Sequence, residues 1–119
     1  MAIPLLHTVV SWLLKKRVHD IELFIKYPNE VQREELTKLL QTAKNTEVGK
    51  QYGFADVQHY EDFASRVPVR TYEEIAPLIE RSRKGEQNIF WPTPIRWYAK
   101  SSGTTNAKSK FIPISNESL

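Results

Sequence analysis

Apolar residues recur three and four positions apart over most of the chain, which is the spacing of an amphipathic helix. The first such pattern predicts a helix from about residue 5 to the position before Pro28, since the residue before a proline avoids the helical conformation. We expect this helix to pack on a core through its apolar stripe. The alternative is a helix that lies on a membrane surface. The stripe consists of Val10, Leu14, Val18, Ile21 and Ile25.

Polar residues with the spacing of helix caps mark the boundaries of further helices. Asn29 and Thr71 each precede a helical pattern and have Gln or Glu three positions later, as in a capping box. Gly85 follows the last of these patterns, where a left-handed glycine commonly ends a helix. A short helix near residues 59–65 is expected to turn Tyr60, Phe63 and Ala64 inward. The sequence therefore predicts several helices before about residue 86.

The pattern changes to that of strands near the carboxyl end. Residues 95–99 form a short aromatic run bounded by a proline and by polar residues, and a second apolar run covers residues 111–114. The linker between these two runs is rich in hydroxyl side chains and contains one glycine. We therefore predict an α+β fold, with a helical part over about residues 5–86 and a β-hairpin over about residues 95–114.

The composition excludes several classes of protein. The chain of 119 residues has no Cys, which excludes disulfides and a thiol nucleophile, and its net charge is only +3. The apolar run at residues 2–14 is shorter than the about 20 residues of a membrane-spanning helix. Basic residues follow that run instead of preceding it, unlike those of a secretory signal. We expect a cytoplasmic protein with no membrane partner.

The three histidines do not have metal-site spacing. His7 and His19 lie too far apart on the first predicted helix to share an ion, and His59 stands beside acidic residues that suit a helix cap. No H-E-x-x-H motif occurs. We therefore predict no metal ligand in this chain.

The linker between the predicted strands has the chemistry of an anion-binding loop. Residues 87–116 contain no Asp or Glu. Hydroxyl and backbone N–H groups donate hydrogen bonds to anions, and a glycine lets the backbone approach a ligand closely. A lysine adds a point charge. These features favour a polyphosphate, although an ordinary hairpin turn could have the same composition, and the loop matches neither a Walker A nor a dinucleotide motif. Four basic residues lie in this range: Arg96, Lys100, Lys108 and Lys110.

The same loop resembles the phosphate-binding signature of the adenylate-forming superfamily. Its form is similar to that of the auxin-responsive acyl-acid amido synthetases of plants and their bacterial relatives. Residues 46–54 and 67–75 resemble two earlier segments of that family, so the resemblance runs from about residue 25 to the end. Asn106 stands where many superfamily members have a second glycine, and Asn tolerates a left-handed backbone. The motif reads Ser101-Ser102-Gly103-Thr104-Thr105, then Lys110-Phe111-Ile112-Pro113.

The resemblance implies an enzyme that binds ATP and magnesium, adenylates a small carboxylic acid and transfers the acyl group to an amine, as of an amino acid. It further implies that Lys110 orients the triphosphate or fixes the loop, with Lys108 as the rival lysine. Gly103 would permit the close approach of the backbone. The hydroxyls implied to bind the β- and γ-phosphates are Ser101, Ser102, Thr104 and Thr105.

The resemblance also implies that residues 1–119 are the N-terminal portion of a larger α/β domain. The acid that binds magnesium and the acyl pocket would lie in the remainder of the polypeptide. We therefore expect that remainder to be a partner of this chain. By the same resemblance the chain contains no catalytic residue, and we expect it to be inactive alone.

A non-catalytic alternative is a small helical module whose basic hairpin binds RNA or another anionic partner. Aromatic residues near the basic ones suit base stacking. They also suit hairpin packing, which we favour, so we expect no nucleic-acid partner. These residues are Trp91, Trp97, Tyr98 and Phe111.

Overall fold

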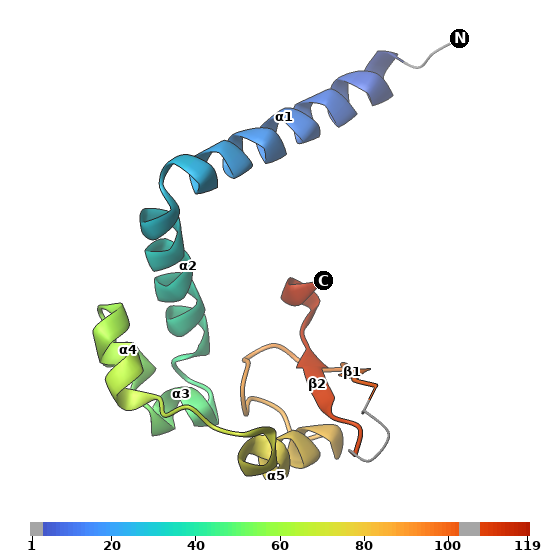
Figure 1. The fold of residues 1–119 in the computed structure, drawn as a ribbon. Helices are drawn as coiled ribbons and strands as arrows, with labels where there is room; N and C mark the ends of the chain where they lie inside the picture. The colour runs from blue at the N-terminus through green and yellow to red at the C-terminus, as the bar shows by residue number, and fades with distance from the viewer. Residues whose placement is uncertain (1–3, 103–107) are drawn as a thin grey trace. The chain divides into compact units, whose positions relative to one another are not determined.

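The computed structural model describes residues 4–102 and 108–119. Helices come first and a two-stranded hairpin last, which confirms the predicted α+β class (Figure 1). The chain forms two compact units, Met1–Leu36 and Thr37–Leu119. The elements are α1 (Pro4–Lys26), α2 (Pro28–Ala43), α3 (Glu47–Gln51), the 3-10 helix η1 (Phe54–Asp56), α4 (Tyr60–Arg66), α5 (Tyr72–Arg83), β1 (Trp97–Lys100), β2 (Phe111–Ile114) and the 3-10 helix η2 (Asn116–Ser118).

The first unit contains α1, which ends before Pro28 as the sequence predicts. The Asn29 cap is wrong, because α2 already begins at Pro28. A proline suits the first helical position, where its φ fits and its missing N–H needs no partner. The stripe of α1 is exposed, from 45% at Val10 to 73% at Ile25, so the expected packing on a core is not seen. Within the described residues, no helix is long and apolar enough to cross a membrane.

The second unit has a small core. A tight turn between α2 and α3 contributes Thr46 and Ala43 to the buried residues of this unit. Thr46 is fully buried; its hydroxyl donates to the Ala43 carbonyl at 2.7 Å and accepts from the Gly49 N–H at 3.0 Å. A Cβ at Gly49 would lie 2.0 Å from the Ala43 oxygen, so only glycine fits there. The buried apolar residues are Leu40, Ala43, Val57, Ile79, Ile89 and Ile95.

Backbone hydrogen bonds and one arginine fasten α3 to the segment after α5. The N–H groups of Glu47 and Val48 donate to the carbonyls of Asn88 and Ile89, both at 3.0 Å. Arg81 donates to both carboxylate oxygens of Glu47, at 2.8 and 2.7 Å, and also to Glu86. The bonds from Arg81 lower the pKa of both carboxyl groups. The last turn of α5 and the segment that follows it are thus tied to α3.

The caps of α5 match the sequence. Thr71 precedes the helix, and its N–H donates to Glu74 at 2.6 Å, which confirms the capping box and lowers the pKa of Glu74. Gly85 has a φ of 104°, and the N–H groups of Gly85 and Glu86 bond back to the last turn, as in a Schellman motif. In α4 the predicted inward positions are wrong for Tyr60, which is 67% exposed, and for Ala64, which is also exposed, while Phe63 is half-buried.

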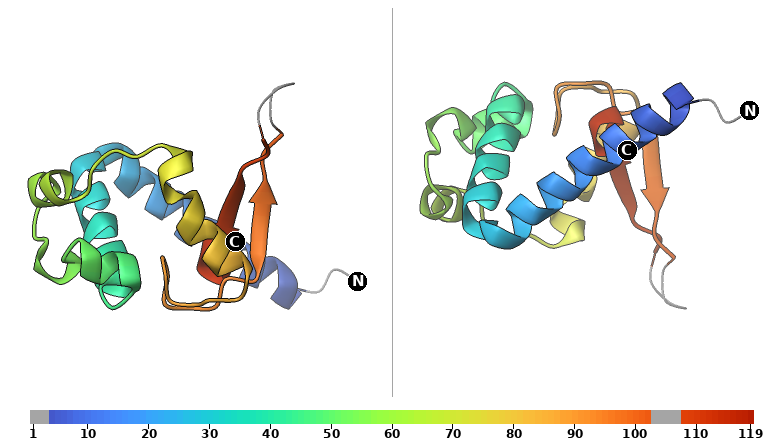
Figure 2. Two further views of the ribbon diagram at one scale, coloured as in Figure 1. Left: turned by 90° about the horizontal axis from the view of Figure 1, so that it is seen from below. Right: turned by 90° about the horizontal axis from the view of Figure 1, so that it is seen from above.

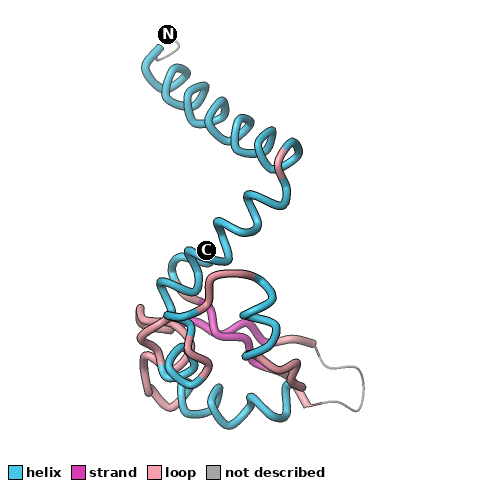
Figure 3. Tube along the Cα trace, turned by 90° about the vertical axis from the view of Figure 1, so that its left-hand side faces the viewer, coloured by secondary structure: helices cyan, strands magenta, loops and turns pink. Residues whose placement is uncertain are grey.

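The hairpin is antiparallel, with Trp97 opposite Ile114 and Lys100 opposite Phe111. Figure 3 shows the two short strands in magenta among the cyan helices. Helix α5 lies beside β2 (Figure 2). The hydroxyl groups of Ser82 in α5 and Tyr98 in β1 share a hydrogen bond of 2.6 Å. Helix α5 therefore supports the strands that lead into the hydroxyl-rich loop.

Candidate phosphate-binding site

The base of the loop is closed by two hydrogen bonds between Ser101 and Lys110. The Ser101 N–H donates to the Lys110 carbonyl at 2.9 Å, and the Lys110 N–H donates to Ser101 Oγ at 3.2 Å. These bonds continue the hairpin by one step beyond the Lys100 and Phe111 pair. The first hydroxyl of the motif and its lysine, nine positions apart in the chain, are therefore held together.

The other members of the predicted site fall into two groups. Ser102 is exposed, as are the two rival lysines, while Ser101 is half-buried. Gly103, Thr104 and Thr105 lie outside the described residues. Of the predicted site, the structure therefore describes four residues: Ser101, Ser102, Lys108 and Lys110.

Tyr72 contacts the base of the loop, and the sequence analysis did not identify it. Its Oη accepts a hydrogen bond from the Phe111 N–H at 2.9 Å. The Lys110 Nζ lies 5.4 Å from the centroid of its ring. Tyr72 precedes Phe111 by 39 positions, so no local pattern links the two residues. Only the packing of α5 on the hairpin brings them together.

The basic side chains around the loop have no acidic partner among the residues that the structure describes. Among the described residues, no carboxylate oxygen lies within 4.0 Å of the four basic side chains named below. The potential at the loop therefore favours an anion. The four residues are Arg96, Lys100, Lys108 and Lys110.

The aromatic residues near the loop divide between packing and exposure. Phe111 lies under the guanidinium of Arg83, which is 3.7 Å from its ring centroid, and the hydroxyl of Tyr98 is bonded to Ser82. Trp97 is 64% exposed. Two of these rings thus take part in hairpin packing, as the sequence analysis favoured, and one remains at the surface.

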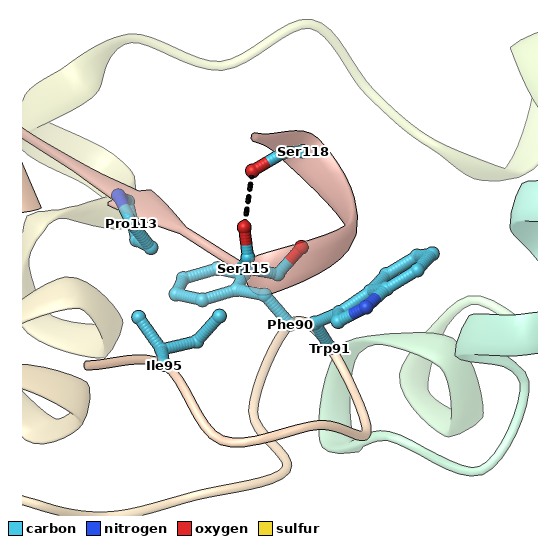
Figure 4. A pocket seen from close by; sticks show the side chains of 6 residues that line it. All are labelled: Phe90, Trp91, Ile95, Pro113, Ser115 and Ser118. Carbon is cyan, nitrogen blue, oxygen red and sulfur yellow. Dashed lines mark hydrogen bonds between the residues drawn. The ribbon is translucent and has the colours of Figure 1, made fainter. Parts of the chain in front are cut away.

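A separate small cavity lies where the segment after α5 meets the end of β2 (Figure 4). Its volume is about 220 Å³, below the roughly 300–1,000 Å³ of typical ligand pockets. The cavity is therefore too small for a nucleotide. The residues that line it are Phe90, Trp91, Ile95, Pro113, Ser115 and Ser118.

In residues 4–102 and 108–119, no three His, Asp or Glu residues come close enough together to hold a metal ion.

A comparison with protein families identifies the chain. The model of the GH3 family N-terminal domain matches residues 17–119. The chain belongs to the GH3 family. The match begins within α1 and includes every later element and the complete hydroxyl-rich loop.

Curated relatives agree with this assignment to the GH3 family. The chain is 34% identical over 105 residues to an indole-3-acetic acid-amido synthetase of Arabidopsis thaliana, which covers 87% of this chain and 19% of the relative. It is 31% identical over 101 residues to a jasmonoyl–L-amino acid synthetase of Nicotiana attenuata, covering 84% of this chain and 18% of the relative. The resemblance to the acyl-acid amido synthetases is thus confirmed, and the chain spans about a fifth of the length of these relatives.

Proposed function

We propose that this GH3-family segment supplies the loop that binds the triphosphate of ATP in an acyl-acid amido synthetase. The observation that carries the proposal is the closure of the hydroxyl-rich loop by Ser101 and Lys110. The closure joins the backbone of Lys110 to the Ser101 hydroxyl at one end of an acid-free loop. The Lys110 ammonium has no acidic neighbour within the described ranges. A triphosphate needs both kinds of group, because donors and cations offset its charge.

Each residue of the motif has a role in this proposal. Lys110 orients the phosphate tail, and Lys108 is the second candidate for that role. Ser101 Oγ accepts the Lys110 N–H, so its own proton remains available to a phosphate oxygen. Gly103 allows the backbone to approach the ligand. The hydroxyls assigned to the β- and γ-phosphates are Ser101, Ser102, Thr104 and Thr105.

The proposed reaction joins a small carboxylic acid to an amine, as of an amino acid. The carboxylate attacks the α-phosphorus of ATP, pyrophosphate leaves, and the amine then attacks the acyl adenylate. The loop would stabilise charge on the departing pyrophosphate by positioning and electrostatics rather than by covalent chemistry. Any magnesium would be bound by the triphosphate and by one or two carboxylates, which the proposal assigns to the remainder of the polypeptide.

The organisation of the chain follows from the same proposal. Residues 1–119 form the N-terminal portion of the adenylate-forming domain, with its helical part at about 5–86 and its phosphate-loop hairpin at about 95–114. The remainder of the polypeptide would supply the acyl pocket. The support is that the relatives are about five times as long as their matched segments.

Lys110→Ala in the complete enzyme tests the phosphate role. Loss of one charge-assisted bond costs about 1.5–3 kcal/mol, which corresponds to roughly 10- to 150-fold in kcat/KM for ATP. The measurement is exchange of labelled pyrophosphate into ATP, driven by a carboxylic acid, together with the melting temperature. Lys108→Ala is the matched control and should lose less. The proposal would be contradicted if the fall in kcat/KM, expressed as a free energy, were no larger than the fall in the free energy of unfolding.

The 119-residue chain by itself should not turn over, because the acyl pocket would be missing. The same exchange assay, followed by detection of amide product, measures this. Amide formation by the isolated chain would contradict the proposal that the acyl pocket lies in the remainder of the polypeptide.

A further inference from the structure

The first residue of α5 is held in a defined position beside the loop. Thr71 and Glu74 cap the helix, with the Thr71 N–H and hydroxyl both donating to one Glu74 oxygen, at 2.6 and 3.1 Å. Capping fixes the direction in which a helix begins. Tyr72 follows the cap directly, so its ring leaves a backbone that is already ordered.

Tyr72 contacts the base of the loop through two different parts of its side chain. The hydroxyl oxygen accepts the Phe111 N–H at 2.9 Å and thereby fixes the backbone just after Lys110. The face of the ring lies under the Lys110 ammonium, 5.4 Å from the centroid. The hydrogen bond therefore fixes the backbone next to Lys110, and the ring contact fixes the position of its ammonium group.

The kind of contact is suited to a lysine that must bind an anion. A carboxylate partner would neutralise the ammonium, whereas an aromatic face attracts a cation without cancelling its charge. At an exposed site this attraction is weak, so the ammonium can turn toward a stronger acceptor. No acidic oxygen lies within 4.0 Å of Lys110 in the described part of the chain.

We infer that Tyr72 is a positioning residue for Lys110, which it holds charged and oriented for the triphosphate of ATP. The inference rests on the phosphate-binding role proposed above for Lys110. It assigns no contact between Tyr72 and the nucleotide. Preorganisation of this kind lowers the cost of ordering a long side chain when the ligand arrives.

Two substitutions at Tyr72 and one matched control test the inference in the complete enzyme. Tyr72→Leu removes the ring and the hydroxyl, and Tyr72→Phe removes the hydroxyl alone. Tyr98→Phe is the control, because it deletes a tyrosine hydroxyl at the same contact between α5 and the hairpin, where it is bonded to Ser82. We expect Tyr72→Leu to raise the KM for ATP about 2- to 5-fold, the equivalent of an exposed cation–π contact. Tyr98→Phe should leave that KM unchanged.

A double-mutant cycle with Lys110→Ala separates positioning from simple stability. If Tyr72 acts through Lys110, Tyr72→Leu raises the ATP KM in the parent enzyme and has no further effect in the Lys110→Ala background. The same rise in both backgrounds, or no rise in either, overturns the inference while leaving the proposed function intact. An unchanged ATP KM in Lys110→Ala itself would instead defeat the proposed function. Should Tyr72→Leu fail to fold, Tyr72→Phe tests the hydroxyl contact alone, because it removes the acceptor of the Phe111 N–H and keeps the ring. It should then raise the ATP KM in the parent enzyme and have no further effect in the Lys110→Ala background, and a rise of equal size in both backgrounds overturns the inference.

Discussion

Helices α1 and α5 are both predicted from apolar residues at helical spacing, and both form, yet their apolar faces differ in burial. In α1 the stripe is half or more exposed at most positions, with Ile25 at 73%. In α5 Ile79 is 3% exposed, and Ile75 and Leu78 are half-buried. Periodicity therefore determines that a helix forms and which face is apolar. Burial of that face requires a partner surface. Of these two helices, α5 has such a surface within its own unit.

The partners of α5 are the hairpin and the segment that holds α3. Ser82 bonds to Tyr98, Tyr72 bonds to Phe111, and Arg81 bonds to Glu47. A helix fixed by three such contacts can orient a loop. A helix with an exposed stripe cannot do so by itself, and we assign no part of the site to α1.

The largest effect is expected where the unit of α5 is most tightly packed. Gly49→Ala would place a Cβ 2.0 Å from the Ala43 oxygen, so the turn between α2 and α3 must shift. We expect a loss of about 3 kcal/mol or more in the free energy of unfolding. Urea unfolding followed by circular dichroism measures it. Lys50→Ala, at an exposed position of α3, is the control and should change little.

The comparison of the two helices is tested directly by one pair of variants. Ile79→Ala in α5 should lower the free energy of unfolding by about 3 kcal/mol, because it empties a buried site. Ile25→Ala in α1 should change it by less than about 0.5 kcal/mol, because that side chain is exposed. Chemical denaturation of both variants provides the measurement. Equal losses would show that the face of α1 is packed as tightly as that of α5.

The smallest of these effects concerns Arg81 and depends on pH. Arg81 lowers the pKa of Glu47 and Glu86 below their ordinary value of 4.5. Their ionised forms therefore stabilise the folded state above pH 4.5, and this contribution is lost as the pH falls through the lowered values. Arg81→Gln should reduce the melting temperature at pH 7, and its difference from the parent should shrink below pH 4.5.

The control for the pH effect is Lys16→Gln, which removes a charge from the exposed helix α1. Its melting temperature should follow the parent at every pH. A difference between Arg81→Gln and the parent that stays constant from pH 7 to pH 3 would show that the two carboxylates do not provide the stabilisation.

Local signals predicted much of this fold because caps and turns depend on neighbours in the sequence. Thr71 with Glu74 and the left-handed Gly85 were predicted correctly, as was the antiparallel hairpin. Asn29 was misassigned because proline competes for the start of a helix. Tyr60 was misassigned because α4 is short and has little core to cover.

The candidate site was predictable only in part, for a related reason. Ser101 and Lys110 belong to a contiguous motif, so the sequence was sufficient to nominate them. Tyr72 is separated from Phe111 by 39 positions, and a tyrosine that follows a helix cap has no pattern of its own. Its contact with the loop can be recognised only from the packing of α5 against β2.

The sequence by itself determined the helices and the hairpin of this protein, its GH3 family and the hydroxyl-rich, acid-free loop. Each of these depends on residues close together in the chain or on a motif that can be read in order. The tertiary structure decided which apolar face is buried, which carboxylates Arg81 binds and which ring lies under Lys110. Those contacts join residues far apart in the chain, and their formation depends on how the elements pack, which local propensity does not specify.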